Sequence, residues 1–233
     1  MIVSFVNCLD NYLPEGYRSD SLLCKPYWAA AEMIVRALQG ETATIDYRKF
    51  SDAGLLIQPL IPRLDNVQIE LFLWSNFVDA KGDFFDIDGM KLRPLTNPSI
   101  KQFWEITAED IDRRDAWLAK NGYQKLPLLD LSQLRQLWLE VDKLLLATSP
   151  KAIKALVFYD YTRIRNTTLL TNMQETQAEM ISVLKPLGWE TFQLPKNFPK
   201  LELDDNWAHY DTHLANEFMS QVYQECGIIK EEQ

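Results

Sequence analysis

The stretch Val67–Trp74, VQIELFLW, is a mostly apolar run that follows a connecting segment containing Pro59 and Pro62. Its length and its β-branched and aromatic side chains predict a buried strand. A second apolar run, Ile2–Val6, opens the chain, and Tyr27–Gln39 has the composition and spacing of a helix. Strand, helix and strand in this order are typical of a parallel sheet with crossover helices.

The alternation of strands and helices continues on both sides of this stretch. Thr42–Tyr47 is rich in β-formers and is predicted as a second strand, after a helix that Gly40 ends. Beyond residue 150 the predicted elements are a strand, a helix, a strand and a terminal helix, at Ala155–Tyr159, Asn172–Leu187, Trp189–Leu194 and Leu214–Cys226. We therefore predict one α/β domain over residues 1–233, with a three-layer, flavodoxin-like parallel sheet.

Residues 84–149 have a different character from the rest of the chain. Asp88-Gly89 stands between two short apolar runs and predicts a hairpin turn. Ser99–Asn121 and Leu131–Ala147 follow, and both are long, charged and helical in period. We predict that 84–149 is a hairpin plus a helical insertion, or cap, within the α/β domain.

Composition argues against several classes of function. The eight glycines lie at least seven residues apart, so neither G-x-G-x-x-G nor G-x-x-x-x-G-K-[ST] occurs and we expect no nucleotide cofactor. A net charge of −9 and a pI near 4.8 argue against nucleic acid as a partner. There is no run of 18 apolar residues, so we expect no membrane contact. Three irregularly spaced cysteines without a C-x-x-C, and a start without a basic region, favour a reduced, cytoplasmic location.

The carboxyl ends of the predicted strands indicate where a site would lie, because open parallel sheets bind ligands beyond those ends. The polar residues that follow the predicted strands are Asn7, Cys8, Asp10, Arg48, Lys49, Ser75, Asn76, Asp79, Asp160, Tyr161, Arg163 and Arg165. Of these, we expect Asn7, Asp10, Asn76, Arg163 and Arg165 to bind a small-molecule substrate.

Both histidines fall in one short stretch of the chain. His209 and His213 are four residues apart, with Asp211 between them. Histidine is well suited to proton transfer near pH 7, and an Asp commonly orients such a base. We expect Asp211 to begin the terminal helix, His213 to be the base in its first turn, and His209 to contact substrate. The same three residues could bind a divalent ion, although we assign no metal site; a helix cap beside two surface histidines is the structural alternative.

This layout resembles that of the SGNH, or GDSL-type, hydrolases. In that family a nucleophilic Ser follows the first strand, and a late Asp-x-His or Asp-x-x-His segment opens the final helix; Asp211–His213 is similar to that segment. The resemblance implies an SGNH-like sheet and a small hydrolase or acyl-transfer enzyme. Where the family has Gly-Asp-Ser-Leu, Val6–Leu9 reads VNCL. The implied nucleophile is therefore Cys8, or else Ser19 or Ser21 in the following loop.

Other functions stay open at this point. The chain could be a non-catalytic α/β protein that binds a partner through its Trp-rich helical insertion, or one that binds a small anionic ligand. Arg48, Arg163 and Arg165 could together hold a carboxylate or phosphate, which would suit a phosphoryl- or sugar-handling enzyme. Cys8 could be a small buried hydrophobic residue rather than a nucleophile. A homo-oligomer is also compatible with the sequence.

Overall fold

A four-stranded parallel sheet lies at the centre of the computed structural model. The described residues are 1–6, 30–41, 44–57, 62–96, 106–161, 164, 166–196 and 212–229. In spatial order the strands are β1 (Ile2–Phe5), β3 (Leu71–Trp74), β8 (Ile153–Phe158) and β9 (Glu190–Gln193). The sheet confirms the prediction of an α/β fold built on parallel strands.

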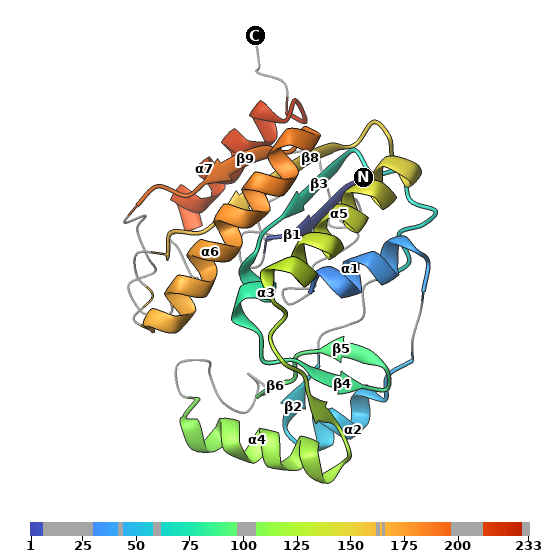
Figure 1. The fold of residues 1–233 in the computed structure, drawn as a ribbon, viewed down its shortest axis with the longest axis vertical. Helices are drawn as coiled ribbons and strands as arrows, with labels where there is room; N and C mark the ends of the chain where they lie inside the picture. The colour runs from blue at the N-terminus through green and yellow to red at the C-terminus, as the bar shows by residue number, and fades with distance from the viewer. Residues whose placement is uncertain are drawn as a thin grey trace.

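Three helices cover one face of this sheet: α1 (Ala31–Leu38), α5 (Leu131–Thr148) and α6 (Thr167–Leu184). Figure 1 shows them lying side by side across the strands. The strands follow one another across the sheet in chain order, so right-handed crossovers place every connecting helix on the same face. Helix α7 (Thr212–Glu225) covers the opposite face.

The two faces of the sheet have separate apolar cores, because side chains alternate along each strand. Phe72 and Trp74 of β3 pack with the layer of α1, α5 and α6. Leu71 and Leu73 of the same strand pack with Met219 and the other buried side chains of α7.

A smaller unit lies at one end of the core, at the bottom of Figure 1. It contains two small antiparallel sheets. In one, β2 (Leu55–Leu56) pairs with β6 (Leu95–Thr96). In the other, the strand order is β5 (Met90–Leu92), β4 (Phe85–Ile87) and β7 (Gln124–Lys125). Its helices are α2 (Tyr47–Asp52) and α4 (Ala108–Lys120). The short α3 (Phe77–Lys81) connects β3 to this unit, and the turn η4 (Lys185–Leu187) precedes β9. Of the predicted insertion 84–149, α5 thus lies in the helical layer, and the strands and α4 lie in the smaller unit.

The predicted hairpin turn is confirmed. Asp88 and Gly89 have φ values of 53° and 78°, which is the backbone conformation that two-residue hairpins require. They join β4 to β5 in an antiparallel pair.

The predicted strand Thr42–Tyr47 is wrong. Of that range, residues 44–46 are described and pair with no strand, and α2 begins at Tyr47. The cause is local, since the Asp46 side chain accepts a hydrogen bond from the backbone N–H of Lys49 at 3.4 Å and caps the helix. As a result, β3 lies directly beside β1 in the central sheet.

Among the described residues, no helix is long and apolar enough to cross a bilayer.

Candidate functional site

Polar side chains gather where β3 and β8 end. Asn76 is completely buried, and its Nδ2 donates a hydrogen bond to the backbone carbonyl of Met173 at 2.8 Å. Its Oδ1 accepts a hydrogen bond from the hydroxyl of Tyr161, which follows β8. Asp160 and Ser75 are also buried at these strand ends. Asn76 therefore ties α6 to the ends of two strands and holds this edge of the sheet in a fixed geometry.

Most of the residues predicted for the site lie outside the described part of the chain. They are Asn7, Cys8, Asp10, Arg163, Arg165, His209 and Asp211, together with the alternative nucleophiles Ser19 and Ser21. Of the predicted catalytic and substrate-binding residues, the structure places Asn76 and His213.

His213 lies in the first turn of α7, where the sequence predicts it. Its side chain is 82% exposed, and its Nε2 lies 3.2 Å from Oε1 of Glu217, one turn further along the helix. The other end of α7 is near the start of β9, because the charge of Glu190 acts on the Cys226 thiol. At 1.5 Å per residue, His213 is about 20 Å from that end. Helix α7 therefore runs antiparallel to β9, and His213 lies toward the carboxyl edge of the sheet.

Two further residues, Cys226 and Arg48, have the surroundings of structural rather than reactive side chains. Burial raises the pKa of the Cys226 thiol to about 12, so this thiol stays protonated and is a poor nucleophile. Arg48 has a side chain that is 89% exposed and lies 4.0 Å from Asp52 on the same helix, as an ordinary surface ion pair does.

The carboxylate of Asp79 caps helix α1 from a distant part of the chain. Its Oδ1 accepts a hydrogen bond from the backbone N–H of Ala31 at 3.0 Å, and Ala30 at the N-cap position has no side-chain oxygen to do so. In many parallel α/β proteins this first helix N-terminus binds a phosphate. Here the protein's own carboxylate is hydrogen-bonded to it, in agreement with the absence of a glycine-rich phosphate loop.

Asp79 is also a perturbed acid. Burial raises the pKa of Asp79 to about 6, against the opposing influence of the Ala31 N–H, the Lys91 ammonium and the Trp138 indole. Oδ2 of this carboxylate has no hydrogen-bond partner, and neither has the buried Nε1–H of Trp138. The indole is thus close enough to influence Asp79 without reaching hydrogen-bond geometry.

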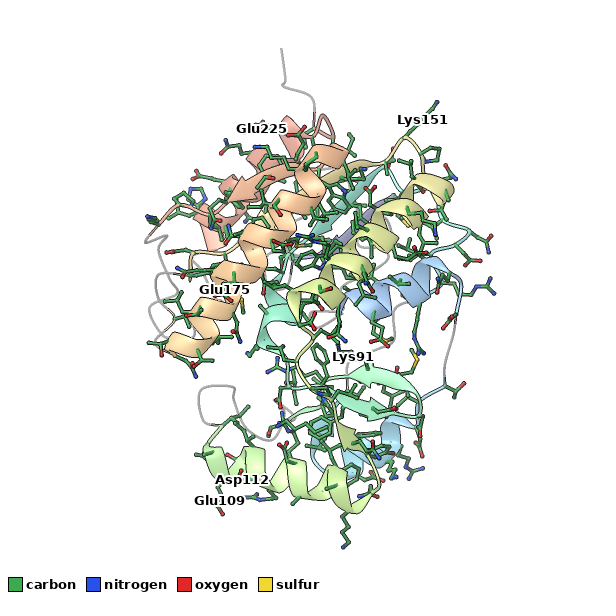
Figure 2. All side chains as sticks on the ribbon, viewed as in Figure 1. Lys91, Glu109, Asp112, Lys151, Glu175 and Glu225 are labelled. Carbon is green, nitrogen blue, oxygen red and sulfur yellow. The ribbon has the colours of Figure 1, made fainter. Side chains whose placement is uncertain are left out.

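Lys91 is the cation whose charge acts on Asp79. It lies in β5, between the α/β core and the smaller unit, as Figure 2 shows. Its side chain packs over the Phe84 ring, with Nζ 5.0 Å from the ring centroid. Burial lowers the pKa of Lys91, while Asp79 and Glu32 oppose that shift. Nothing in the sequence distinguishes Lys91, because a lysine in a short hairpin strand is ordinarily expected on the solvent side.

A second buried charge cluster lies within the smaller unit. Arg114 contacts Asp83 at 2.8 Å and Asp115 at 2.6 Å, and its side chain is almost wholly buried. Although burial acts to raise it, Arg114 and Lys125 hold the pKa of Asp83 below its usual value. Burial lowers the pKa of Arg93 to about 10, against the attraction of Asp83. These contacts join the segment just before β4 to α4 and β7, so the cluster fixes the smaller unit internally.

Among the described residues, no group of three His, Cys, Asp or Glu side chains could hold a metal ion. Comparison with protein-family models, curated proteins and solved structures finds nothing that matches this chain.

Proposed function

We propose that the protein is a small hydrolase or acyl-transfer enzyme with an SGNH-like arrangement on its parallel sheet. The observation that supports this best is the position of His213, which is accessible and lies toward the sheet edge where such folds bind substrates. Asp211 would orient the imidazole of His213, and Cys8, or else Ser19 or Ser21, would be the nucleophile. Within residues 84–149, the hairpin and α4 would form the cap, and the cysteine pattern favours a cytoplasmic location.

The proposed chemistry proceeds in two steps. His213 takes the proton of the nucleophile as that group attacks the acyl carbonyl, and the protonated imidazole returns the proton to the leaving group. The acyl group is then transferred from the enzyme to water or to another acceptor, with His213 removing the proton of that acceptor and returning it to the released nucleophile. Substrate would be held by Asn7, Asp10, Arg163, Arg165 and His209 on a scaffold that Asn76 keeps rigid.

Esters and thioesters of short acyl groups with a chromogenic leaving group provide the test. We expect His213→Ala to lose at least about 100-fold in kcat/KM, with an unchanged unfolding midpoint because the side chain is exposed. Asn216→Ala is the matched control, since Asn216 is exposed on the same helix. Labelling with iodoacetamide or a fluorophosphonate, followed by mass spectrometry, would distinguish Cys8 from Ser19 and Ser21. Wild-type turnover no faster than that of His213→Ala would refute the proposal.

A second candidate is a non-catalytic protein that binds a partner, and exposed leucines on α5 favour it. Leu131, Leu139 and Leu146 are 37%, 43% and 57% exposed, and at 100° per residue they fall within roughly 80° of the helix circumference. This candidate would be supported if the wild type self-associates in sedimentation experiments and the double variant Leu139→Asp/Leu146→Asp does not. A monomeric wild type that hydrolyses acyl esters would reject it.

A further inference from the structure

The two edge strands of the central sheet differ in how far they are covered. Strand β1 lies at one edge, and its residues Ile2–Phe5 are all buried. Strand β9 lies at the other edge, beyond β8, as Figure 1 shows. In β9, Glu190 and Gln193 are exposed, and Thr191 and Phe192 are only partly buried. One edge of the sheet is therefore accessible to solvent.

The pairing of β9 with β8 shows which backbone groups of β9 are directed outward. The two strands are parallel, with Phe158 opposite Gln193, and the Leu194 N–H donates to the Phe158 carbonyl at 3.0 Å. Because alternate residues of a strand bond to the same neighbour, Phe192 and Leu194 bond to β8. The N–H and C=O of Thr191 and Gln193 are consequently directed away from β8. No other described strand pairs with β9.

These outward groups lack the protection that edge strands commonly have. Natural edge strands contain lysine, proline or a bulge, or another element covers them. Glu190–Gln193 contains neither residue type and pairs with β8 without a bulge. The Gln193 side chain does not cover the edge, because it is hydrogen-bonded to the Tyr159 carbonyl and to Gln177 of α6. An added strand would satisfy the outward backbone groups of Thr191 and Gln193.

The charges beside this edge favour a second copy of the chain in antiparallel orientation. The charged residues of the stretch 188–196 are Glu190 near its start and Lys196 at its end. Both side chains are exposed, and neither makes an ion pair with another described residue. An antiparallel copy brings the Glu190 end of one chain to the Lys196 end of the other, whereas a parallel copy places like charges together. The edge is therefore complementary to itself.

We propose that β9 pairs with β9 of a second copy, so that the two four-stranded sheets form one continuous sheet across a twofold axis. With Phe192 opposite its counterpart, Thr191 of each copy exchanges backbone hydrogen bonds with Gln193 of the other. Pro195, at the next outward-facing position, has no N–H and ends the pairing. A ladder this short gives a weak, concentration-dependent dimer. This inference does not depend on the proposed hydrolase function, and it uses a different surface from the exposed leucines of α5.

Sedimentation of a proline variant tests the pairing. Thr191→Pro keeps the β8–β9 ladder, because the N–H that it removes is directed outward, but it takes one donor from each copy in the dimer. We expect its dimer dissociation constant to be at least about 10-fold above that of the wild type. Thr191→Val is the matched control, since it retains the N–H and should dimerise as the wild type does. A wild type that stays monomeric up to about 1 mM, or a dimer that Thr191→Pro leaves unchanged, overturns the proposal.

Exchange of charges tests the orientation and the identity of the partner. Glu190→Lys and Lys196→Glu should each weaken dimerisation by about 3- to 10-fold, because each places like charges together at both ends of the paired strands. The double variant, and an equimolar mixture of the two single variants, should both regain the wild-type affinity. No recovery in either case contradicts antiparallel self-pairing. A dimer that Leu139→Asp/Leu146→Asp abolishes would be held by α5 instead, which also contradicts it.

Hydrogen exchange in the wild type locates the interface and stays decisive even if Thr191→Pro does not fold. In the monomer, the Phe192 amide should be protected by its bond to β8, and the amides of Thr191 and Gln193 should exchange freely. At concentrations where about nine-tenths of the chains are dimeric, exchange at Thr191 and Gln193 should slow by about 10-fold. The amide of Leu156 in the buried β8 should not change. Dimerisation without protection of Thr191 and Gln193 would place the interface elsewhere and overturn the proposal.

Discussion

Among the described residues, Asp142 with Lys154 and Asp79 with Lys91 each place an aspartate and a lysine near a tryptophan, and the two sets are hydrogen-bonded very differently. In the core, Asp142 Oδ1 lies 2.6 Å from Lys154 Nζ and accepts a hydrogen bond from Trp189 Nε1–H at 2.7 Å. Lys154 also donates to the backbone carbonyl of Leu187 at 3.0 Å. This pair connects α5, β8 and the turn before β9, with its donors directed at acceptors.

The pair of Asp79 and Lys91 has the same chemical groups but an incomplete set of bonds. The indole that would correspond to Trp189 is Trp138, and its N–H makes no hydrogen bond. The same residue types can therefore serve as a fixed structural link in one place and as a group that responds to pH in another. What separates the two pairs is hydrogen-bond geometry, because both aspartates are buried.

The largest expected effect comes from removing the lysine of the satisfied pair. Lys154→Met leaves Asp142 as a buried carboxylate without its cation, and we expect a loss of about 3–5 kcal/mol in the free energy of unfolding at pH 7. The loss in the free energy of unfolding caused by Lys91→Met should be smaller, since Asp79 has a raised pKa and can take up a proton instead. Urea unfolding of both variants measures this. Equal losses would mean that the two pairs are equivalent.

A smaller effect on the free energy of unfolding is expected when the pH is changed. The folded pKa of Asp79, about 6, lies above the ordinary value of 3.8, so its contribution to stability is complete below pH 4 and is lost as the pH rises through 6. We expect wild-type stability to fall by on the order of 3 kcal/mol from pH 4 to pH 7 relative to Asp79→Asn. Urea unfolding at several pH values gives this difference, and parallel pH profiles for the two proteins would be the contrary result.

The contrast between the two pairs could not be predicted from the sequence, although much of the fold could. Asp88 and Gly89 determine the hairpin turn locally through their positive φ values. Burial of Lys91 instead depends on Asp79 and Trp138, which lie in other elements. A pattern of apolar and polar residues contains no information on such contacts until the elements are packed.

The difference between local sequence signals and contacts between distant elements also explains how much of the candidate site could be predicted. It explains, too, why the strand predicted at Thr42–Tyr47 is wrong. Local spacing alone predicts His213 in the first turn of a helix, and it lies there in the structure. The internal hydrogen bonds of Asn76 depend on Tyr161 and Met173, which are far away in the chain. At Thr42–Tyr47, β-propensity gave the wrong element because the Asp46 cap starts a helix.

The smallest effect compares the two indoles directly. Trp189→Phe and Trp138→Phe each remove part of a buried ring, so both lose packing energy of similar size. Trp189→Phe also removes a hydrogen bond to the Asp142 carboxylate, and we expect it to cost about 1–2 kcal/mol more in unfolding free energy at pH 7. Trp138→Phe removes an unpaired N–H, and it should raise the pKa of Asp79 further because the indole acts to lower it. If Trp138→Phe proved the costlier change, its indole would have to be as fully bonded as that of Trp189, and the Asp79 pair would be a second structural link.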